Sequence, residues 1–201
     1  MLFRSAIAPY YADALSFGRG CGHFLAWGVF ENQSMKMSER YLPSGVLDEK
    51  LNLTEADESK ITEYVGHSWY KGTGTYQAPD FTTEPEFTDY DVNDRYTWCK
   101  APAYDGKAYE ATSLSRVLVA YQRNVSFMRR NVDSMLEALG AAGNLDIIQS
   151  TLGRTAVRQV ETLYIASLMK EWVDELIEAV KGGDSEYFKE PVTVAGDGAG
   201  F

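Results

Sequence analysis

One long run of helical periodicity constrains this chain more than any other feature. From Thr155 to the pair Gly182-Gly183, apolar side chains recur every three or four residues: Val157, Val160, Tyr164, Leu168, Trp172, Leu176 and Val180. This spacing is typical of one face of an α-helix, and the run spans about seven turns at 3.6 residues each. The chain is therefore expected to be mainly α-helical.

Two shorter helices are predicted upstream of this one. The first covers Leu114 to Arg123, and its apolar side chains align on one face. The second covers roughly Ser126 to Leu139 and ends at Gly140, a residue that suits the end of a helix.

Two further helices are expected nearer the N-terminus. Helical spacing covers Ala6 to Phe17. Another helix is expected from Thr54 to about Gly66, because Thr54 can cap its first turn and Ile61, Tyr64 and Val65 would share one face.

Three other segments suggest extended or irregular structure. The bulky stretch from His23 to Phe30 suits a buried strand, and Arg95 to Tyr109 reads as a hairpin about the turn-forming pair Asp105-Gly106. Ser68 to Asp94 has no sustained period and is rich in Gly, Thr, Pro and aromatic residues, which predicts a long ordered aromatic loop. The expected fold is a mainly α helical bundle scaffold with a short β-hairpin and this loop, without an interdomain linker.

Composition excludes several classes of protein. With 45% hydrophobic and 13% aromatic residues the chain can form a core, so it is not expected to be disordered. A net charge of −10 argues against nucleic acid as a partner, because phosphate-binding surfaces need clustered Lys and Arg. The uncharged stretch around Gly20 to Phe30 is far shorter than the roughly 20 apolar residues of a membrane span, so no span is expected.

The chain is poor in metal ligands. Its two cysteines, Cys21 and Cys99, belong to no CxxC pair, and its only histidines are His23 and His67. A zinc or iron–sulfur site would need all four residues to converge, so two reduced and mostly buried thiols are the simpler expectation.

Gly18, Gly20 and Gly22 are not expected to form a dinucleotide-binding loop. That motif needs a strand before the glycines and a helix after them, whereas the predicted order here is the reverse. Close backbone packing accounts for the three glycines more simply.

No catalytic pair stands out from the residues alone. Lys100 and Glu110 lie on opposite arms of the predicted hairpin, which favours an ordinary cross-strand ion pair. The two histidines suit structural roles, because a catalytic base needs a partner within reach.

Three blocks of the sequence resemble a known family. HSWYKGTGTY, RYTWCKAPAYDGKAYEATSLSRVLVAY and QSTLGRTAVRQVETLYIASLMKEWVDEL follow the order and spacing of the large, catalytic subunit of nickel–iron hydrogenases, and YYADALSFGRGCGHFLAWGVF is similar to an earlier segment of it. The resemblance covers nearly the whole chain and is strongest to the membrane-associated uptake type. It implies the central part of the large-subunit fold, with residues 1–201 as a single partial domain.

The resemblance implies a parent enzyme that oxidises or forms H2 at a Ni–Fe centre and passes electrons to an iron–sulfur small subunit. Four cysteine thiolates from two CxxC motifs hold that centre in the family, and neither motif occurs here. The chain is therefore expected to be an internal fragment that is inactive alone, with no catalytic, cofactor-binding or metal-binding residue of its own. The parent is expected to be prokaryotic and membrane-associated or periplasmic through its small subunit.

Two local departures from the family pattern are visible. Ala103 stands where the family usually has Arg, and Ala111-Thr112-Ser113 replaces a segment containing Gly-Pro. These changes remove a bidentate donor and a rigid backbone constraint.

Several residues are expected to matter by this resemblance. Those that could orient the metal's ligands or support the scaffold around the parent's centre are Lys100, Glu110, Arg116, Arg154 and Arg158. Those that could pack against the rest of the large subunit or the small subunit are His67, Trp69 and Trp98.

The alternative is a free-standing helical binding or assembly module, derived from the same scaffold and without metal chemistry. A third interpretation, a nucleotide-binding oxidoreductase, depends on the glycines alone.

Overall fold

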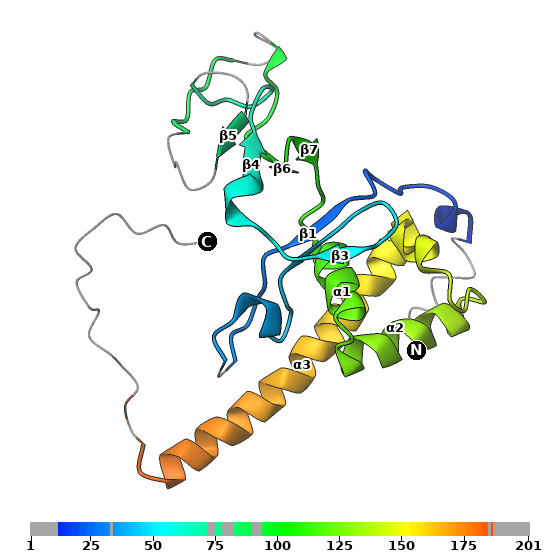
Figure 1. Cartoon of the computed structure of the whole chain (residues 1–201), viewed down its shortest axis with the longest axis vertical. Helices are drawn as coiled ribbons and strands as arrows, with labels where there is room; N and C mark the ends of the chain where they lie inside the picture. The colour runs from blue at the N-terminus through cyan, green and yellow to red at the C-terminus, as the bar shows by residue number, and fades with distance from the viewer. Residues whose placement is uncertain are drawn as a thin grey trace. The chain divides into compact units, whose positions relative to one another are not determined.

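The computed structural model describes residues 12–32, 34–71, 75–77, 83–89, 94–184 and 186. The chain divides into two compact units, Met1–Glu161 and Thr162–Phe201, whose boundary falls within the last helix. In the described residues of the first unit, two small antiparallel sheets accompany the helices (Figure 1).

The first sheet has the order β1-β2-β3, formed by Phe24–Ala26, Gly45–Leu47 and Leu53–Thr54. Phe24 lies opposite Leu47, and every residue of β1 and β2 is buried. This confirms the extended structure expected within the His23–Phe30 segment. Burial on both faces explains why β1 is continuously apolar rather than alternating.

The second sheet has the order β5-β4-β6-β7, formed by Thr75–Gln77, Ile61–Tyr64, Ala101–Tyr104 and Lys107–Ala108. The predicted hairpin is confirmed: β6 and β7 pair about Asp105 (φ 51°) and Gly106 (φ 73°). Two successive positive φ angles match the tight turn that suits the right-handed twist of a hairpin.

The prediction of a helix from Thr54 to Gly66 is wrong. Thr54 ends β3, a 3-10 turn at Glu58–Lys60 follows, and Ile61–Tyr64 is strand β4. Asp57 accepts a 3.0 Å hydrogen bond from the backbone N–H of Ser59, so it caps the short turn instead of a long helix. Pairing of β4 with both β5 and β6 outweighs the weak helical spacing of this segment.

Part of the segment predicted as an aromatic loop also forms a strand, since β5 lies within it. Residues 72–74, 78–82 and 90–93 of that segment lie outside the described residues. The helix expected over Ala6 to Phe17 is seen only as a 3-10 turn at Ala12–Leu15, because residues 6–11 also lie outside them.

The three helices expected in the second half are confirmed as α1 (Ser113–Gln122), α2 (Ser126–Ala138) and α3 (Thr151–Lys181). A further 3-10 turn at Leu145–Gln149 leads into α3. The fold of the described residues is thus mixed α/β and mostly helical, with two small sheets where one hairpin was expected.

The core lies where α1 packs on β1 and β2 and against α2. Its fully buried side chains come from all of these elements and from the 3-10 turn that precedes α3: Phe24, Leu47, Val117, Leu118, Met128, Val132, Leu136 and Ile148. Among the described residues, no helix is long and apolar enough to cross a membrane.

Candidate functional site

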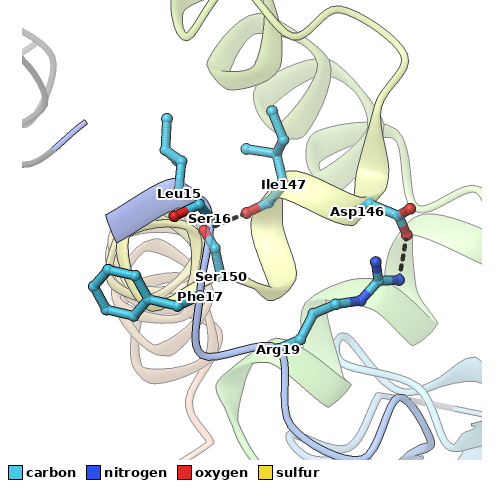
Figure 2. Close-up of a pocket in the computed structure, with 7 residues that line it drawn as sticks. All are labelled: Leu15, Ser16, Phe17, Arg19, Asp146, Ile147 and Ser150. Atoms are coloured by element: carbon cyan, nitrogen blue, oxygen red, sulfur yellow. Dashed lines mark hydrogen bonds and ion pairs between the residues drawn. The ribbon is translucent and has the colours of Figure 1, made fainter. Parts of the chain in front are cut away.

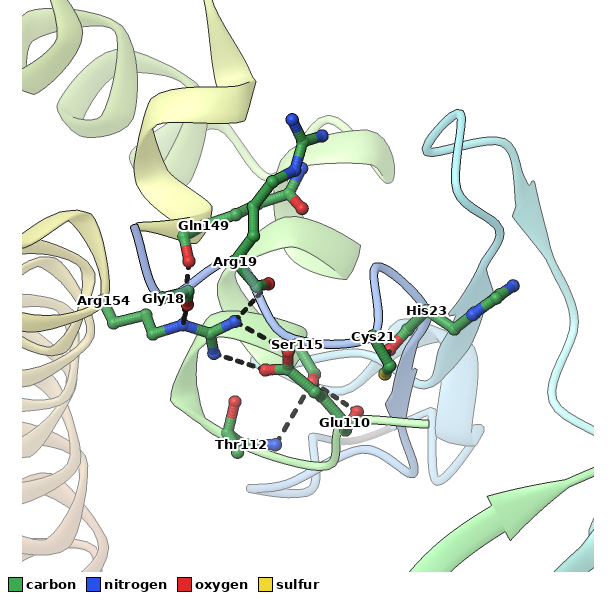
Figure 3. Close-up of polar contacts among 9 residues, drawn as sticks. All are labelled: Gly18, Arg19, Cys21, His23, Glu110, Thr112, Ser115, Gln149 and Arg154. Carbon is green, nitrogen blue, oxygen red and sulfur yellow. Dashed lines mark hydrogen bonds and ion pairs between the residues drawn. The ribbon is translucent and has the colours of Figure 1, made fainter. Parts of the chain in front are cut away.

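Arg154, in the first turn of α3, is the centre of a hydrogen-bond network that joins three separate segments (Figure 3). Its Nη2 donates to Glu110 Oε1 at 2.7 Å, and its Nη1 donates to Glu110 Oε2. Its Nε donates to the backbone carbonyls of Gly18 at 2.9 Å and Gln149 at 2.8 Å, and Nη2 also donates to that of Arg19 at 2.7 Å. We call these five residues the Arg154 network.

The Arg154–Glu110 pair is largely shielded from water, whereas Gly18 and Arg19 are exposed. The side chains of Arg154 and Glu110 are 22% and 15% exposed. The hydrogen bonds that Arg154 donates to the Glu110 carboxylate raise the pKa of Arg154, while desolvation acts in the opposite direction. A bidentate pair of this kind fixes the relative orientation of the two side chains in addition to pairing their charges, because the planar guanidinium matches the geometry of the carboxylate.

The glycines before β1 allow this close approach. Gly18 and Gly20 have φ angles of 87° and 75°, and Gly22 also has a positive φ. A Cβ atom at Gly20 would collide with the carboxylate of Glu110, and one at Gly18 with the hydroxyl of Thr151. The close packing predicted from these glycines is therefore confirmed at both positions.

The backbone of Glu110 is as constrained as its side chain. Its N–H donates to His23 O at 2.9 Å, and its carbonyl accepts from Leu25 N at 2.8 Å and from Ser115 Oγ at 2.6 Å. Ser115 Oγ in turn accepts from Thr112 N at 3.2 Å, at the start of α1. These contacts hold Glu110 between β1 and α1.

A second charged pair joins α1 to α3. Arg116 donates to Glu161 through Nε at 2.5 Å and through Nη2 at 3.1 Å, and the Glu161 side chain is 8% exposed. The sequence interpretation missed Glu161, although a carboxylate between Val157 and Tyr164 on an apolar helix face was the available signal. Arg158 is exposed on α3.

Lys100 does not pair with Glu110, so that expectation is wrong. Its Nζ lies 2.7 Å from Glu63 Oε2 and 2.8 Å from Thr83 Oγ1. The register explains this difference: β6 pairs along β4 with Ala101 opposite Tyr64, which brings Lys100 to Glu63. Beyond β7 the chain turns to β1, where Glu110 bridges Phe24.

His67, Trp69 and Trp98 lie close together around the second sheet. Trp69 and Trp98 meet edge to face with ring centroids 5.0 Å apart, and His67 stacks on Tyr96 at 5.6 Å. Trp69 is buried at 5% exposure, whereas Trp98 is 47% and Phe87 54% exposed. Together with Phe87 and Tyr96, these residues form what we call the aromatic cluster.

A hollow of about 290 Å³ borders the aromatic cluster, lined by residues that include His67, Tyr96, Cys99 and Lys100. His67 Nδ1 lies 3.1 Å from the carbonyl of Asp94. Lys100 is held by Glu63, so the hollow presents no assembled acid–base pair among the described residues.

Two other hollows lie in the first unit. One of about 130 Å³ is bordered by the exposed pair Arg19–Asp146, whose Nη2 and Oδ1 are 2.9 Å apart, and by Ser16, Phe17 and Ser150 (Figure 2). The other, of about 330 Å³, includes His23, whose Nε2 lies 3.4 Å from Glu49 Oε1. Neither brings a nucleophile to a base.

The residues present do not fit a nickel–iron centre. Both cysteines are free and exposed, so the expectation of mostly buried thiols is wrong. Cys21 lies between Gly20 and Gly22 before β1, whereas Cys99 precedes β6. In the part of the chain that the structure describes, no three His, Cys, Asp or Glu side chains converge as metal ligands would.

Comparison with known sequences relates nearly all of the chain to one family. The model of the family described as nickel-dependent hydrogenase matches residues 4–199. The uptake hydrogenase large subunit of Bradyrhizobium diazoefficiens is 31% identical over 205 residues, which cover 90% of this chain and 34% of that protein. The hydrogenase-1 large chain of Escherichia coli is 29% identical over 182 residues, which cover 80% of this chain and 30% of that protein.

Solved structures agree with this relationship. The [NiFeSe]-hydrogenase of Dm. baculatum superposes with a TM-score of 0.67 at 25% identity, over 87% of this chain and 35% of that one. The Ni-Fe-Se hydrogenase of D. vulgaris Hildenborough gives the same TM-score and identity, over 87% of this chain and 36% of that one. The chain thus spans about a third of the length of the relatives that it matches.

Proposed function

Because the chain belongs to the nickel-dependent hydrogenase family, we propose that it supplies the central scaffold of a hydrogenase large subunit and has no hydrogenase activity alone. The family match over residues 4–199 carries this proposal. The 31% identity to an uptake hydrogenase large subunit, over 34% of that protein, supports a region of the subunit rather than all of it.

The parent subunit is proposed to catalyse the reversible oxidation of H2 and to pass electrons to an iron–sulfur small subunit. A Ni–Fe centre would supply that chemistry when bound, and soft thiolates are the ligands it requires. With two exposed cysteines, this chain cannot provide four thiolates. No step of the reaction is therefore assigned to its residues.

The charged residues named from the sequence are proposed to act as scaffold. Arg154 and Glu110 connect the loop before β1 to the start of α3, and Arg116 connects α1 to Glu161. Residues that fix helices in this way hold the surroundings of a buried centre without touching it. Arg158, exposed on α3, and Lys100, paired with Glu63, are proposed as contacts with the surrounding subunit.

The aromatic cluster is proposed to contact the remainder of the large subunit or the small subunit. Trp98 and Phe87 are each about half exposed, beside buried Trp69. Exposed aromatic groups of this kind are enriched at protein interfaces. In the isolated chain they should bind an environment-sensitive apolar dye.

Sequencing of the DNA that flanks the coding region tests the proposed function. A reading frame that continues in both directions, with a CxxC pair on each side, is the expected result. Natural start and stop codons that bound the 201 residues would contradict it and would favour a free-standing assembly module.

A further inference from the structure

Two side chains that suit soft metal ions border the same hollow of the first unit. The hollow of about 290 Å³ beside the aromatic cluster is lined by both His67 and Cys99, and both residues are exposed. Thiolate and imidazole are the protein ligands that copper and zinc prefer, whereas magnesium and calcium take oxygen ligands. The hollow therefore offers one nitrogen and one sulfur ligand to an ion that enters from solvent.

Backbone pairing holds these two residues near each other. Ser68 and Thr97 form a parallel bridge, and Tyr96 N donates to His67 O at 3.0 Å, so the two segments run side by side. Cys99 is fixed at the end of this pairing. Its N–H donates to Thr97 Oγ1 at 3.0 Å, and its carbonyl accepts from the hydroxyl of Ser68, which is buried.

The hydrogen bond of His67 leaves its outer nitrogen available to a metal ion. His67 Nδ1 lies 3.1 Å from the carbonyl of Asp94, and a carbonyl only accepts, so Nδ1 carries the proton of the neutral ring. Nε2 then bears the lone pair. Histidines that bind metals are oriented in this way, by a hydrogen bond from the other ring nitrogen to a carbonyl or carboxylate.

The number and charge of the ligands favour a soft monovalent ion. Structural zinc takes four protein ligands, whereas among the described residues no third His, Cys, Asp or Glu joins this pair. Copper(I) prefers soft thiolates and, unlike zinc, is stable with two ligands. With one thiolate and one neutral imidazole it forms a neutral unit, so it adds no net charge beside Lys100, which lines the same hollow. A divalent ion would leave a positive charge there.

The other cysteine and histidine of the chain do not form such a pair. The Cys21 thiol donates to the backbone carbonyl of His23 at 3.5 Å, but the His23 ring points away from the sulfur (Figure 3). The Nε2 of that ring lies 3.4 Å from Glu49 Oε1 and borders a different hollow. The chain thus contains its own control, with the same two residue types in a different arrangement.

We propose that Cys99 and His67 bind one copper(I) ion in this hollow. Cys99 Sγ and His67 Nε2 are the ligands, and the thiol proton is released to solvent as the bond between sulfur and copper forms. The ion remains monovalent, so the step transfers no electron. The site is separate from the proposed function, because it uses a different metal and only residues of this chain.

Competition with the colorimetric chelator bicinchoninate, under anaerobic reducing conditions, tests the site with copper(I) as the probe. The full 201-residue chain should remove about one copper(I) per chain from the chelator. Cys99→Ser and His67→Gln should each weaken binding by about tenfold or more, since even the loss of a group that orients a ligand has an effect of that size. The His67→Gln change keeps a donor for the Asp94 carbonyl, and circular dichroism checks that both variants fold.

Cys21→Ser and His23→Gln are the matched controls, and both should bind copper(I) like the wild type. Nitrogen-15 NMR of the wild-type chain gives a readout without any substitution, because the His67 Nε2 signal should shift on addition of copper(I) and the His23 signals should not.

Four results would overturn the proposal: a wild-type chain that does not compete with the chelator, variants at position 67 or 99 that bind like the wild type, an equal loss in the Cys21→Ser control, or an unchanged His67 signal. A copper-bridged dimer in native mass spectrometry would also overturn it, because two thiols would then hold the ion. None of these readouts depends on hydrogenase activity or on the coding sequence outside the chain, so their failure leaves the proposed function standing.

Discussion

Arg154 donates two hydrogen bonds to the carboxylate of Glu110, a residue 44 positions earlier in the chain. The same guanidinium also reaches three backbone carbonyls in two further segments, before β1 and before α3. One side chain therefore holds together the start of the described chain, the approach to α1 and the start of α3.

Replacement Arg154→Lys should lower the free energy of unfolding by about 2 kcal/mol, because lysine keeps the charge but cannot make the bidentate bond or reach all the carbonyls. Chemical denaturation measures this loss. Arg19→Lys is the matched control, since the Arg19–Asp146 pair is 60% and 59% exposed and should change stability by under about 0.5 kcal/mol. Equal losses in the free energy of unfolding would show that the hydrogen bonds of Arg154 stabilise the fold no more than an exposed ion pair does.

Replacement Gly20→Ala should destabilise the chain by about 3 kcal/mol, because it adds a steric conflict with Glu110 to the cost of a left-handed backbone. Gly106→Ala separates the two effects: its φ is 73° but no atom lies within 4 Å of the added Cβ. That variant should lose only about 1 kcal/mol. Similar melting temperatures for the two variants would contradict the close packing of Gly20.

Tyr121 should make stability fall at high pH. Burial is the main cause that raises the pKa of Tyr121 above that of the unfolded chain, and its hydroxyl donates to Asp133 Oδ1 at 2.8 Å. The protonated form is favoured in the folded state, so this stabilisation is complete below about pH 10 and is lost as the pH rises through the folded pKa. Tyr121→Phe should lose about 1 kcal/mol at neutral pH and show a shallower decline above pH 10, measured by denaturation at each pH. Parallel curves for the two proteins would refute this.

Both thiols should react rapidly with a thiol reagent in the native state, because Cys21 and Cys99 are exposed. Cys21→Ser and Cys99→Ser should each remove half of the fast signal. If either thiol reacts only after denaturant is added, its exposure in the native chain is disproved.

The sequence predicted the helices better than the sheets. The runs that became α1, α2 and α3 have sustained apolar spacing, and Gly140 marked the end of α2, so local signals were sufficient there. The segment Ile61–Tyr64 also carried helical spacing, yet it pairs with β5 and β6. Such long-range pairing leaves little trace in a local pattern.

The partners of the charged residues were harder to predict than the residues themselves. Glu110 and Arg154 were both singled out, but their pairing spans segments whose arrangement no periodicity encodes. The sequence predicted that Lys100 pairs with Glu110 across the hairpin. In the structure the register of β6 on β4 places Lys100 beside Glu63 instead. Gly18 and Gly20 did indicate this site in the sequence. They let the backbone before β1 come close to α3, at the place where Arg154 meets Glu110.

Metal analysis of the purified 201-residue chain, grown with nickel and freed of loosely bound ions, tests the central claim most directly. The account predicts a nickel content far below one ion per chain, unchanged in a Cys21→Ser, Cys99→Ser double variant, because two separate exposed thiols cannot form the four-thiolate site. About one tightly held nickel per wild-type chain, lost in the double variant, would contradict it.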